Sequence, residues 1–152
     1  MQQSIHIKNK RAYFDYEIIE KFTAGIVLHG TEVKSIREGK ASLGDAYCFI
    51  RDNEIFIRGM QVQEYRFGSY NNHSPDRERK LLLEKREIKR LARKTRETGN
   101  TIVTIKLFFS DRGYVKLQIG LAKGKKQYDK RESIKRKDAK RQMDRLQKVK
   151  GR

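Results

Sequence analysis

The feature that most constrains the fold is a run of apolar residues that alternate with polar ones near the start of the chain. From Ala12 to Ile18, and again at Phe22, apolar side chains occupy every second position. A period of two is typical of a half-buried β-strand, so we predict a strand over residues 12–22. A second short strand is expected at residues 25–28. The first part of the chain is therefore expected to be β-structure.

Two later pairs of apolar runs predict β-hairpins. The first pair covers residues 46–51 and 54–58, and the second covers residues 102–109 and 114–120. The turn of the second pair contains Gly113, which adopts a positive φ without steric cost. About six strands are thus expected, in an order that contains no internal repeat and no alternation of strands with helices.

In the first 122 residues, helical signals are confined to two segments. Residues 74–99 predict one long helix, with Ser74 as a capping residue and Pro75 at the first helical position. Residues 31–38 predict a short helix that Gly39 ends. Strands, a long helix and more strands indicate a mainly β fold, a small antiparallel OB-like closed barrel, because closure removes exposed sheet edges and such barrels commonly bind nucleic acid.

Positive charge divides the chain into two parts. The 152 residues contain 37 Lys+Arg and 19 Asp+Glu, a net charge of +18, and residues 123–152 alone carry 14 Lys+Arg against 4 Asp+Glu. Few apolar residues lie in this segment, so burial cannot offset the entropy cost of ordering it. We predict a barrel domain over residues 1–126 and a basic tail over residues 127–152 that is disordered when free. Ala139, Met143 and Leu146 recur at helical spacing, so the tail is expected to fold as a helix on a partner.

The same composition excludes several classes of protein. A single cysteine, Cys48, allows no internal disulfide and no cysteine metal cluster, and its alternating context predicts a buried hydrophobe. The three histidines have no second ligand at metal-binding spacing, so we expect no metal, no cofactor and no catalytic residues. No apolar run could span a bilayer, so a cytoplasmic location is expected. The partner of so basic a chain should be a polyanion, and a nucleic acid fits better than a membrane surface.

Three basic clusters are candidates for phosphate contact. They lie at residues 8–11, 77–80 and 123–126, on separate predicted elements. The predicted helix start would add a partial positive charge beside Arg77 and Arg79. The alternative for each cluster is an ordinary solvated surface.

Four segments resemble the SsrA-binding protein (small protein B) family in order and spacing. They are residues 9–12, 24–37, 75–83 and 119–131, and the resemblance covers roughly residues 5–135. It implies a non-enzymatic bacterial RNA-binding protein with an OB-like barrel. Such a protein binds the tRNA-like domain of transfer-messenger RNA (tmRNA, SsrA RNA) and delivers it to stalled ribosomes for trans-translation. The alternative is a ribosomal-protein-like structural module that binds rRNA.

The resemblance also assigns residues. Those it implies for RNA binding are Asn9, Lys10, Arg11, Arg79, Lys80, Leu82, Lys116, Lys123, Gly124 and Lys125. In the tail it implies that Tyr128, Asp129, Lys130 and Arg131 act at the decoding centre and sense the empty mRNA channel. For Leu82 a core position is the alternative, and for Lys116 a solvated one.

The chain also departs from the family pattern. Thr23 and Glu84 stand where the family often has Glu and His, so neither is carried over as a contact. The resemblance suggests that elongation factor Tu and alanyl-tRNA synthetase associate with this protein only indirectly, through the RNA that they share. A monomer is expected.

Overall fold

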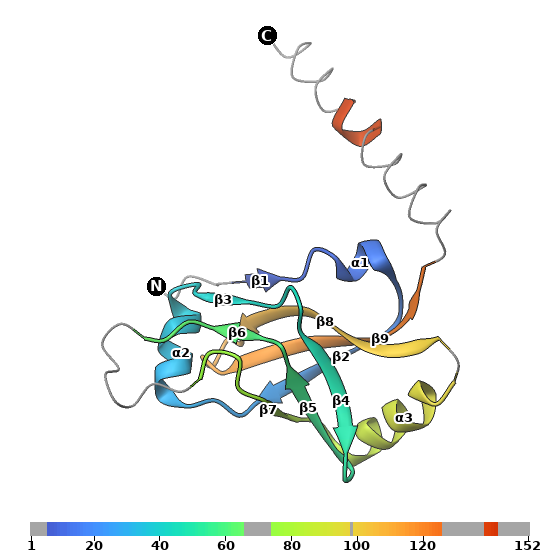
Figure 1. Cartoon of the computed structure of the whole chain (residues 1–152), viewed down its shortest axis with the longest axis horizontal. Helices are drawn as coiled ribbons and strands as arrows, with labels where there is room; N and C mark the ends of the chain where they lie inside the picture. Colours follow the sequence, from blue (N-terminus) through green and yellow to red (C-terminus); the bar gives the residue numbers. More distant parts are fainter. Residues whose placement is uncertain (1–5, 66–73, 98, 126–138, 143–152) are drawn as a thin grey trace.

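The computed structural model describes residues 6–65, 74–97, 99–125 and 139–142 (Figure 1). The strands are β1 (His6–Lys8), β2 (Tyr16–Ile26), β3 (Ala41–Ser42), β4 (Tyr47–Arg51), β5 (Glu54–Arg58), β6 (Gln61–Val62), β7 (Arg79–Leu82), β8 (Asn100–Phe109) and β9 (Val115–Gly124). The labelled helices are α1 (Ala12–Asp15), α2 (Gly30–Arg37) and α3 (Lys85–Thr95). In the predicted tail, residues 139–142 form a helical turn and are exposed, whereas the remainder of residues 126–152 lies outside the described segments.

Seven strands form one antiparallel sheet that closes on itself. Their order is β1-β8-β4-β5-β7-β2-β9, and β9 also pairs with β8, so six of the strands form a ring and β1 extends it from outside. β3 and β6 form a separate two-stranded ladder. Closure leaves no free edge within the ring. The prediction of a mainly β, OB-like closed barrel is confirmed.

The barrel interior holds the hydrophobic core, and α3 covers one end of it. Ile88 and Leu91 of α3 are buried in the same apolar cluster as Leu81, Ile102 and Leu121 from the surrounding strands. The cluster also contains Cys48, as its alternating context predicted. Within the described residues, no helix is long and apolar enough to cross a membrane.

Both hairpins and the short helix are confirmed. β4 and β5 are joined by Asp52 and Asn53, both with positive φ, which is the two-residue turn that matches strand twist. β8 and β9 are joined through a turn in which Gly113 has φ 85°. α2 ends before Gly39, whose φ of 77° takes the chain out of the helix.

The strand predicted over residues 12–22 is wrong at its start. Residues 12–15 form the single turn of α1, in which Asp15 N–H donates to the Arg11 carbonyl at 2.9 Å. Ala12 is buried in a small cluster outside the barrel, so its apolar character reflects helix packing and not strand alternation. The strands predicted over residues 12–22 and 25–28 belong to one strand, β2, because its pairing with β9 continues without a break from Glu20 to Gly25. β2 ends at Ile26, so residues 27 and 28 lie outside it.

The long helix predicted over residues 74–99 is also wrong in its first half. Residues 79–82 form β7, a short strand that pairs with β5 and β2. The side chains of Arg79 and Leu81 are buried and that of Leu82 is exposed, which is the alternation of a strand. Ser74 does not cap a helix, and its hydroxyl donates to Asp76 at 2.7 Å. The helix starts at Lys85, where Glu84 and Glu87 form a reciprocal capping box.

Candidate nucleic-acid interface

The first group of predicted site residues surrounds α1. Asn9 is partly buried, and its side-chain amide donates to the carbonyl and hydroxyl oxygens of Thr104 at 3.0 and 3.2 Å. Its side-chain oxygen accepts from the backbone N–H of Arg11 at 3.3 Å. Asn9 therefore holds its loop against β8, while Lys10 and Arg11 are exposed beside it.

The end of β9 lies against the same helix. Gly124 pairs with Tyr16 at the start of β2, and Lys125 donates from its backbone N–H to the Asp15 carbonyl at 2.9 Å. The Lys125 ammonium donates to the carbonyl of Tyr13 at 2.8 Å. Segments more than 110 residues apart in sequence thus present their cations on either side of α1. A Cβ added at Gly124 would meet no atom within 4 Å, so the backbone there is open to a ligand.

The second group lies on the outer face of the barrel, across three neighbouring strands. Gly25 of β2 is paired with Leu82 of β7 on one side and with Lys116 of β9 on the other. Leu82 is 53% exposed, so its core alternative is wrong, and Lys116 is partly buried. Together with the exposed Tyr114 these side chains line a hollow of about 310 Å³. Exposed apolar groups beside a lysine suit a ligand with both bases and phosphates.

Lys80 points outward from β7 with a partner already in place. Its ammonium lies 2.9 Å from a carboxylate oxygen of Glu54 on the neighbouring strand β5. Both side chains are about half exposed, so the pair is a weak one that a phosphate can displace.

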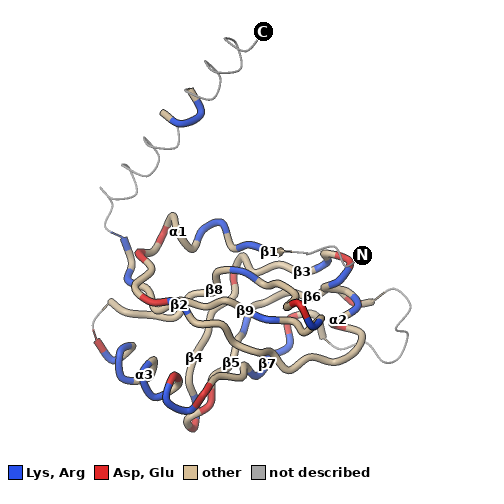
Figure 2. The backbone as a smooth tube through the Cα atoms, turned by 180° about the vertical axis from the view of Figure 1, so that it is seen from behind, with Lys and Arg blue, Asp and Glu red and all other residues tan. Residues whose placement is uncertain are grey.

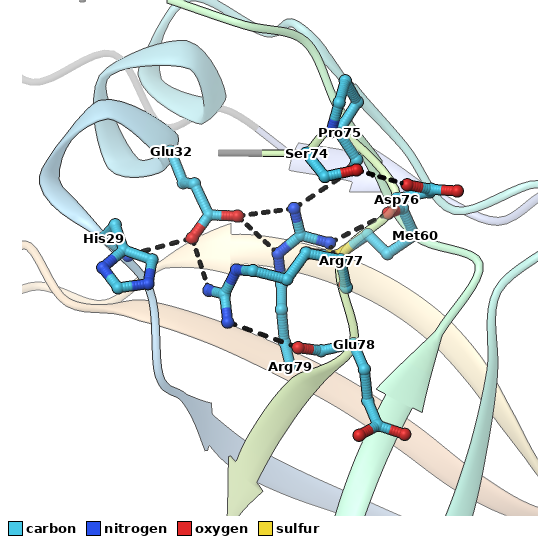
Figure 3. A network of polar contacts seen from close by, with 9 residues as sticks. All are labelled: His29, Glu32, Met60, Ser74, Pro75, Asp76, Arg77, Glu78 and Arg79. Carbon is cyan, nitrogen blue, oxygen red and sulfur yellow. Dashed lines mark hydrogen bonds and ion pairs between the residues drawn. The ribbon is translucent and has the colours of Figure 1, made fainter. Parts of the chain in front are cut away.

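Arg79 occupies a different environment from the one predicted for it. Its side chain is fully buried, and Nε donates to Glu32 at 2.7 Å (Figure 3). Its two terminal nitrogens donate to three backbone carbonyls, those of Met60, Arg77 and Pro75. The guanidinium therefore has no surface to offer RNA in this structure, and it fixes the chain that leads into β7. Nor is it beside a helix start, so the predicted dipole contribution at Arg77 and Arg79 is wrong.

Glu32 is the centre of this network, and the sequence reasoning did not single it out. Its carboxylate also accepts from Arg77 at 2.6 Å and from the backbone N–H of His29 at 3.0 Å. Burial acts to raise the pKa of Glu32, but the hydrogen bonds from Arg77, His29 and Arg79 together hold it below its ordinary value. One signal in the sequence could have identified Glu32: it is an acidic residue in the first turn of a short predicted helix, in a chain with a net charge of +18.

The predicted tail residues Tyr128, Asp129, Lys130 and Arg131 lie outside the described residues. Among the residues that the structure does describe, no three His, Cys, Asp or Glu side chains are grouped as a metal site. Apart from the buried Arg79 and the paired Lys80, the described candidates form two surface groups. The α1 group is Asn9, Lys10, Arg11, Lys123, Gly124 and Lys125, and the Leu82 group is Leu82 and Lys116 with Gly25, which was not predicted, between them.

A closed β-barrel with exposed cations from distant segments places the protein among small basic barrel proteins, a class in which nucleic-acid binding is common. Comparison with known proteins then identifies the particular family. The family model described as "SmpB protein" matches residues 6–149, and the chain belongs to the SmpB family.

Similar curated proteins support the assignment. The SsrA-binding protein of Phocaeicola vulgatus is 58% identical over 142 residues, covering 93% of this chain and 95% of that protein. The SsrA-binding protein of Syntrophobacter fumaroxidans is 57% identical over 93% of this chain and 87% of its own. A chain in the solved structure described as "tmRNA-SmpB: a journey to the center of the bacterial ribosome" is 42% identical, with a TM-score of 0.68 over 85% of this chain and 94% of that chain.

Proposed function

We propose that this protein binds the tRNA-like domain of tmRNA and delivers it to stalled ribosomes for trans-translation. The observation that carries the proposal is the α1 group, in which two distant basic segments meet around one helical turn. Relatives named SsrA-binding protein, and a similar chain in a structure whose description names tmRNA-SmpB and the bacterial ribosome, support the choice of RNA. The protein acts as a non-catalytic monomer in the cytoplasm, and elongation factor Tu and alanyl-tRNA synthetase reach it only through the shared RNA.

The two groups divide the work by chemistry. Lys10, Arg11, Lys123 and Lys125 neutralise phosphates, and the open backbone at Gly124 allows a strand of RNA to come close. Leu82 and Lys116 contact the sugar and base edges of the same RNA. Lys80 exchanges its Glu54 partner for a phosphate. Arg79 contributes indirectly, because it positions the chain that carries Lys80 and Leu82.

Equilibrium binding across a salt series tests this proposal. The full-length protein is titrated with the tRNA-like domain, an elongator tRNA and a single-stranded RNA, from roughly 0.05 to 0.3 M salt. We expect all three affinities to fall with salt, and a preference for the tRNA-like domain to persist at the highest concentration. Parallel loss with no preference would leave only nonspecific charge attraction and would favour the rRNA-binding module.

The tail has a separate role in the proposal. Residues 127–152, with Tyr128, Asp129, Lys130 and Arg131 at the decoding centre, sense the empty mRNA channel. A variant that ends at Lys126 should keep most of its affinity for the tRNA-like domain and lose peptide tagging on stalled ribosomes in a reconstituted translation system. Tagging by the truncated protein at the full-length rate would exclude this role.

A further inference from the structure

Helix α3 has two faces of opposite character. Ile88 and Leu91 face the barrel core, while six of the other nine residues of the helix are Lys or Arg (Figure 2). The cations on and just after the helix are Lys85, Arg86, Lys89, Arg90, Arg93, Lys94 and Arg96. Neither the family resemblance nor the three basic clusters identified in the sequence included them.

Carboxylates partner only part of this charge. Arg90 pairs with Glu20 of β2 at 2.9 Å, Arg86 with Glu84 at 2.6 Å, and Lys94 approaches Glu97 at 3.8 Å. Within the described residues, no carboxylate lies within ion-pair distance of Lys85, Lys89, Arg93 or Arg96. Like charges four residues apart on a helix are destabilising. Arg93 and Lys94 lie in the last turn, where cations stabilise a helix, but helix stability does not explain Lys85 at the helix start or Lys89 in its middle. An external polyanion explains these as well.

The helix also lies between the two groups of candidate RNA contacts. It begins three residues after Leu82. Beyond its other end, Asn100 donates to the Lys94 carbonyl at 3.0 Å and is paired with Lys123. Eleven residues of helix span about 16 Å, so the cations cover the distance between these ends. Along that path, α3 and β2 border a groove of about 530 Å³ lined by Arg86, Lys89, Arg90, Arg93, Glu20, Phe22 and Glu87.

We propose that Arg86, Lys89 and Arg93 form a phosphate-binding strip that follows the backbone of the folded RNA from the Leu82 group to the α1 group. The inference rests on the proposed function, since the occupant is the same tRNA-like RNA. The continuity of the strip with both groups favours one RNA that covers all three surfaces. Phosphates are the expected contacts because the strip offers long cationic side chains that suit the RNA backbone more than base edges.

Two triple variants of equal charge test the strip. R86Q/K89Q/R93Q removes three cations from α3, and Gln is itself a good helix former. The matched control, K34Q/R37Q/K40Q, removes three cations from α2 and its C-terminal end; Figures 1 and 2 place α2 and α3 at opposite ends of the barrel. Circular dichroism and urea unfolding first establish that both variants fold as the wild type does. The measurement is the slope of log affinity against log salt for the tRNA-like domain.

We expect the α3 variant to lower the magnitude of the slope by about 2, since each phosphate contact contributes about 0.7–0.9. The control should change the slope by less than half as much. Equal changes in the two variants, or no change in either, would refute the strip. If the wild type shows no preference for the tRNA-like domain over elongator tRNA, the proposed function itself fails. If the α3 variant keeps both that preference and the wild-type slope, only the strip is refuted.

Discussion

Replacing Glu32 with Gln tests whether a buried ion pair holds the start of β7 in place. The side chains of Glu32 and Arg79 are 5% and 0% exposed, so they form a buried ion pair. Breaking a buried pair by removing one partner costs about 3–5 kcal/mol, because the other charge stays buried without compensation. Glutamine keeps the shape of the carboxylate, but its amide group would direct N–H donors at the donors of Arg77 or Arg79.

A matched Glu→Gln control exists on the surface. Glu54 pairs with Lys80, and both side chains are about half exposed, so E54Q should cost no more than about 1 kcal/mol. Urea unfolding at pH 7 measures both variants. With a slope of about 2 kcal/mol per M, E32Q should lower the urea midpoint by about 2 M and E54Q by less than 0.5 M. A loss in E32Q no larger than that in E54Q would refute a stabilising role for the network.

The pH dependence gives the same experiment a second readout. Hydrogen bonds from Arg77, His29 and Arg79 hold the pKa of Glu32 below 4.5 in the folded protein. The stabilisation is therefore complete above the unfolded-state pKa and is lost as pH falls through the lowered folded pKa. The difference in the free energy of unfolding between wild type and E32Q should be constant from pH 7 to about pH 5 and should narrow below pH 4.5. A difference that stays constant into strong acid would contradict this assignment.

Two further substitutions and one labelling experiment test other parts of the structure. Gly59→Ala should destabilise the protein by at least about 1–2 kcal/mol in urea unfolding, because φ is +86° and the new Cβ would lie 2.6 Å from the Asp45 carbonyl oxygen. Burial raises the pKa of the Cys48 thiol to about 12, so iodoacetamide at pH 8 should label the unfolded protein and leave the native one unmodified. Asn9→Ala should cost about 1 kcal/mol through its lost bonds to Thr104 and weaken binding of the tRNA-like domain, as fluorescence anisotropy would measure.

The parts of the fold that the sequence predicted are those in which local pattern and tertiary environment agree. The hairpin over β8 and β9 has alternating apolar residues and a turn glycine, and both features belong to the same element. The start of the predicted long helix failed because two signals there conflict. Ser74 and Pro75 are favoured at a helix start, yet residues 79–82 are required as a strand to close the barrel between β5 and β2. Such a requirement is set by distant strands and has no local signature.

The candidate site shows the same division. Lys10, Arg11, Lys123 and Lys125 could be found from their charge and from the family motifs, and the structure places their segments together. Arg79 belongs to an equally basic motif but is buried on Glu32. Sequence distance hides that pairing, because 47 residues separate the two side chains. A basic motif on a strand therefore indicates a positively charged segment, but it does not predict which of its side chains point into the interior and which point to solvent.

Pairing separates the structural cations of this chain from those available to a ligand. Glu32 neutralises Arg77 and Arg79 in a largely buried network that fixes the chain leading into β7. Glu78 lies 3.1 and 3.2 Å from Arg51 and Arg58, but these two arginines are about half exposed, so their pairs contribute little to stability. Among the described residues, Lys85, Lys89, Arg93 and Arg96 on and just after α3 have no carboxylate within ion-pair distance, and they add to the surface charge that a polyanion meets. At 0.1 M salt, interactions between exposed charges more than about 10 Å apart are largely screened, whereas a buried pair is affected much less. RNA affinity should therefore fall steeply over a salt range in which the unfolding midpoint barely moves, because different cations govern the two properties.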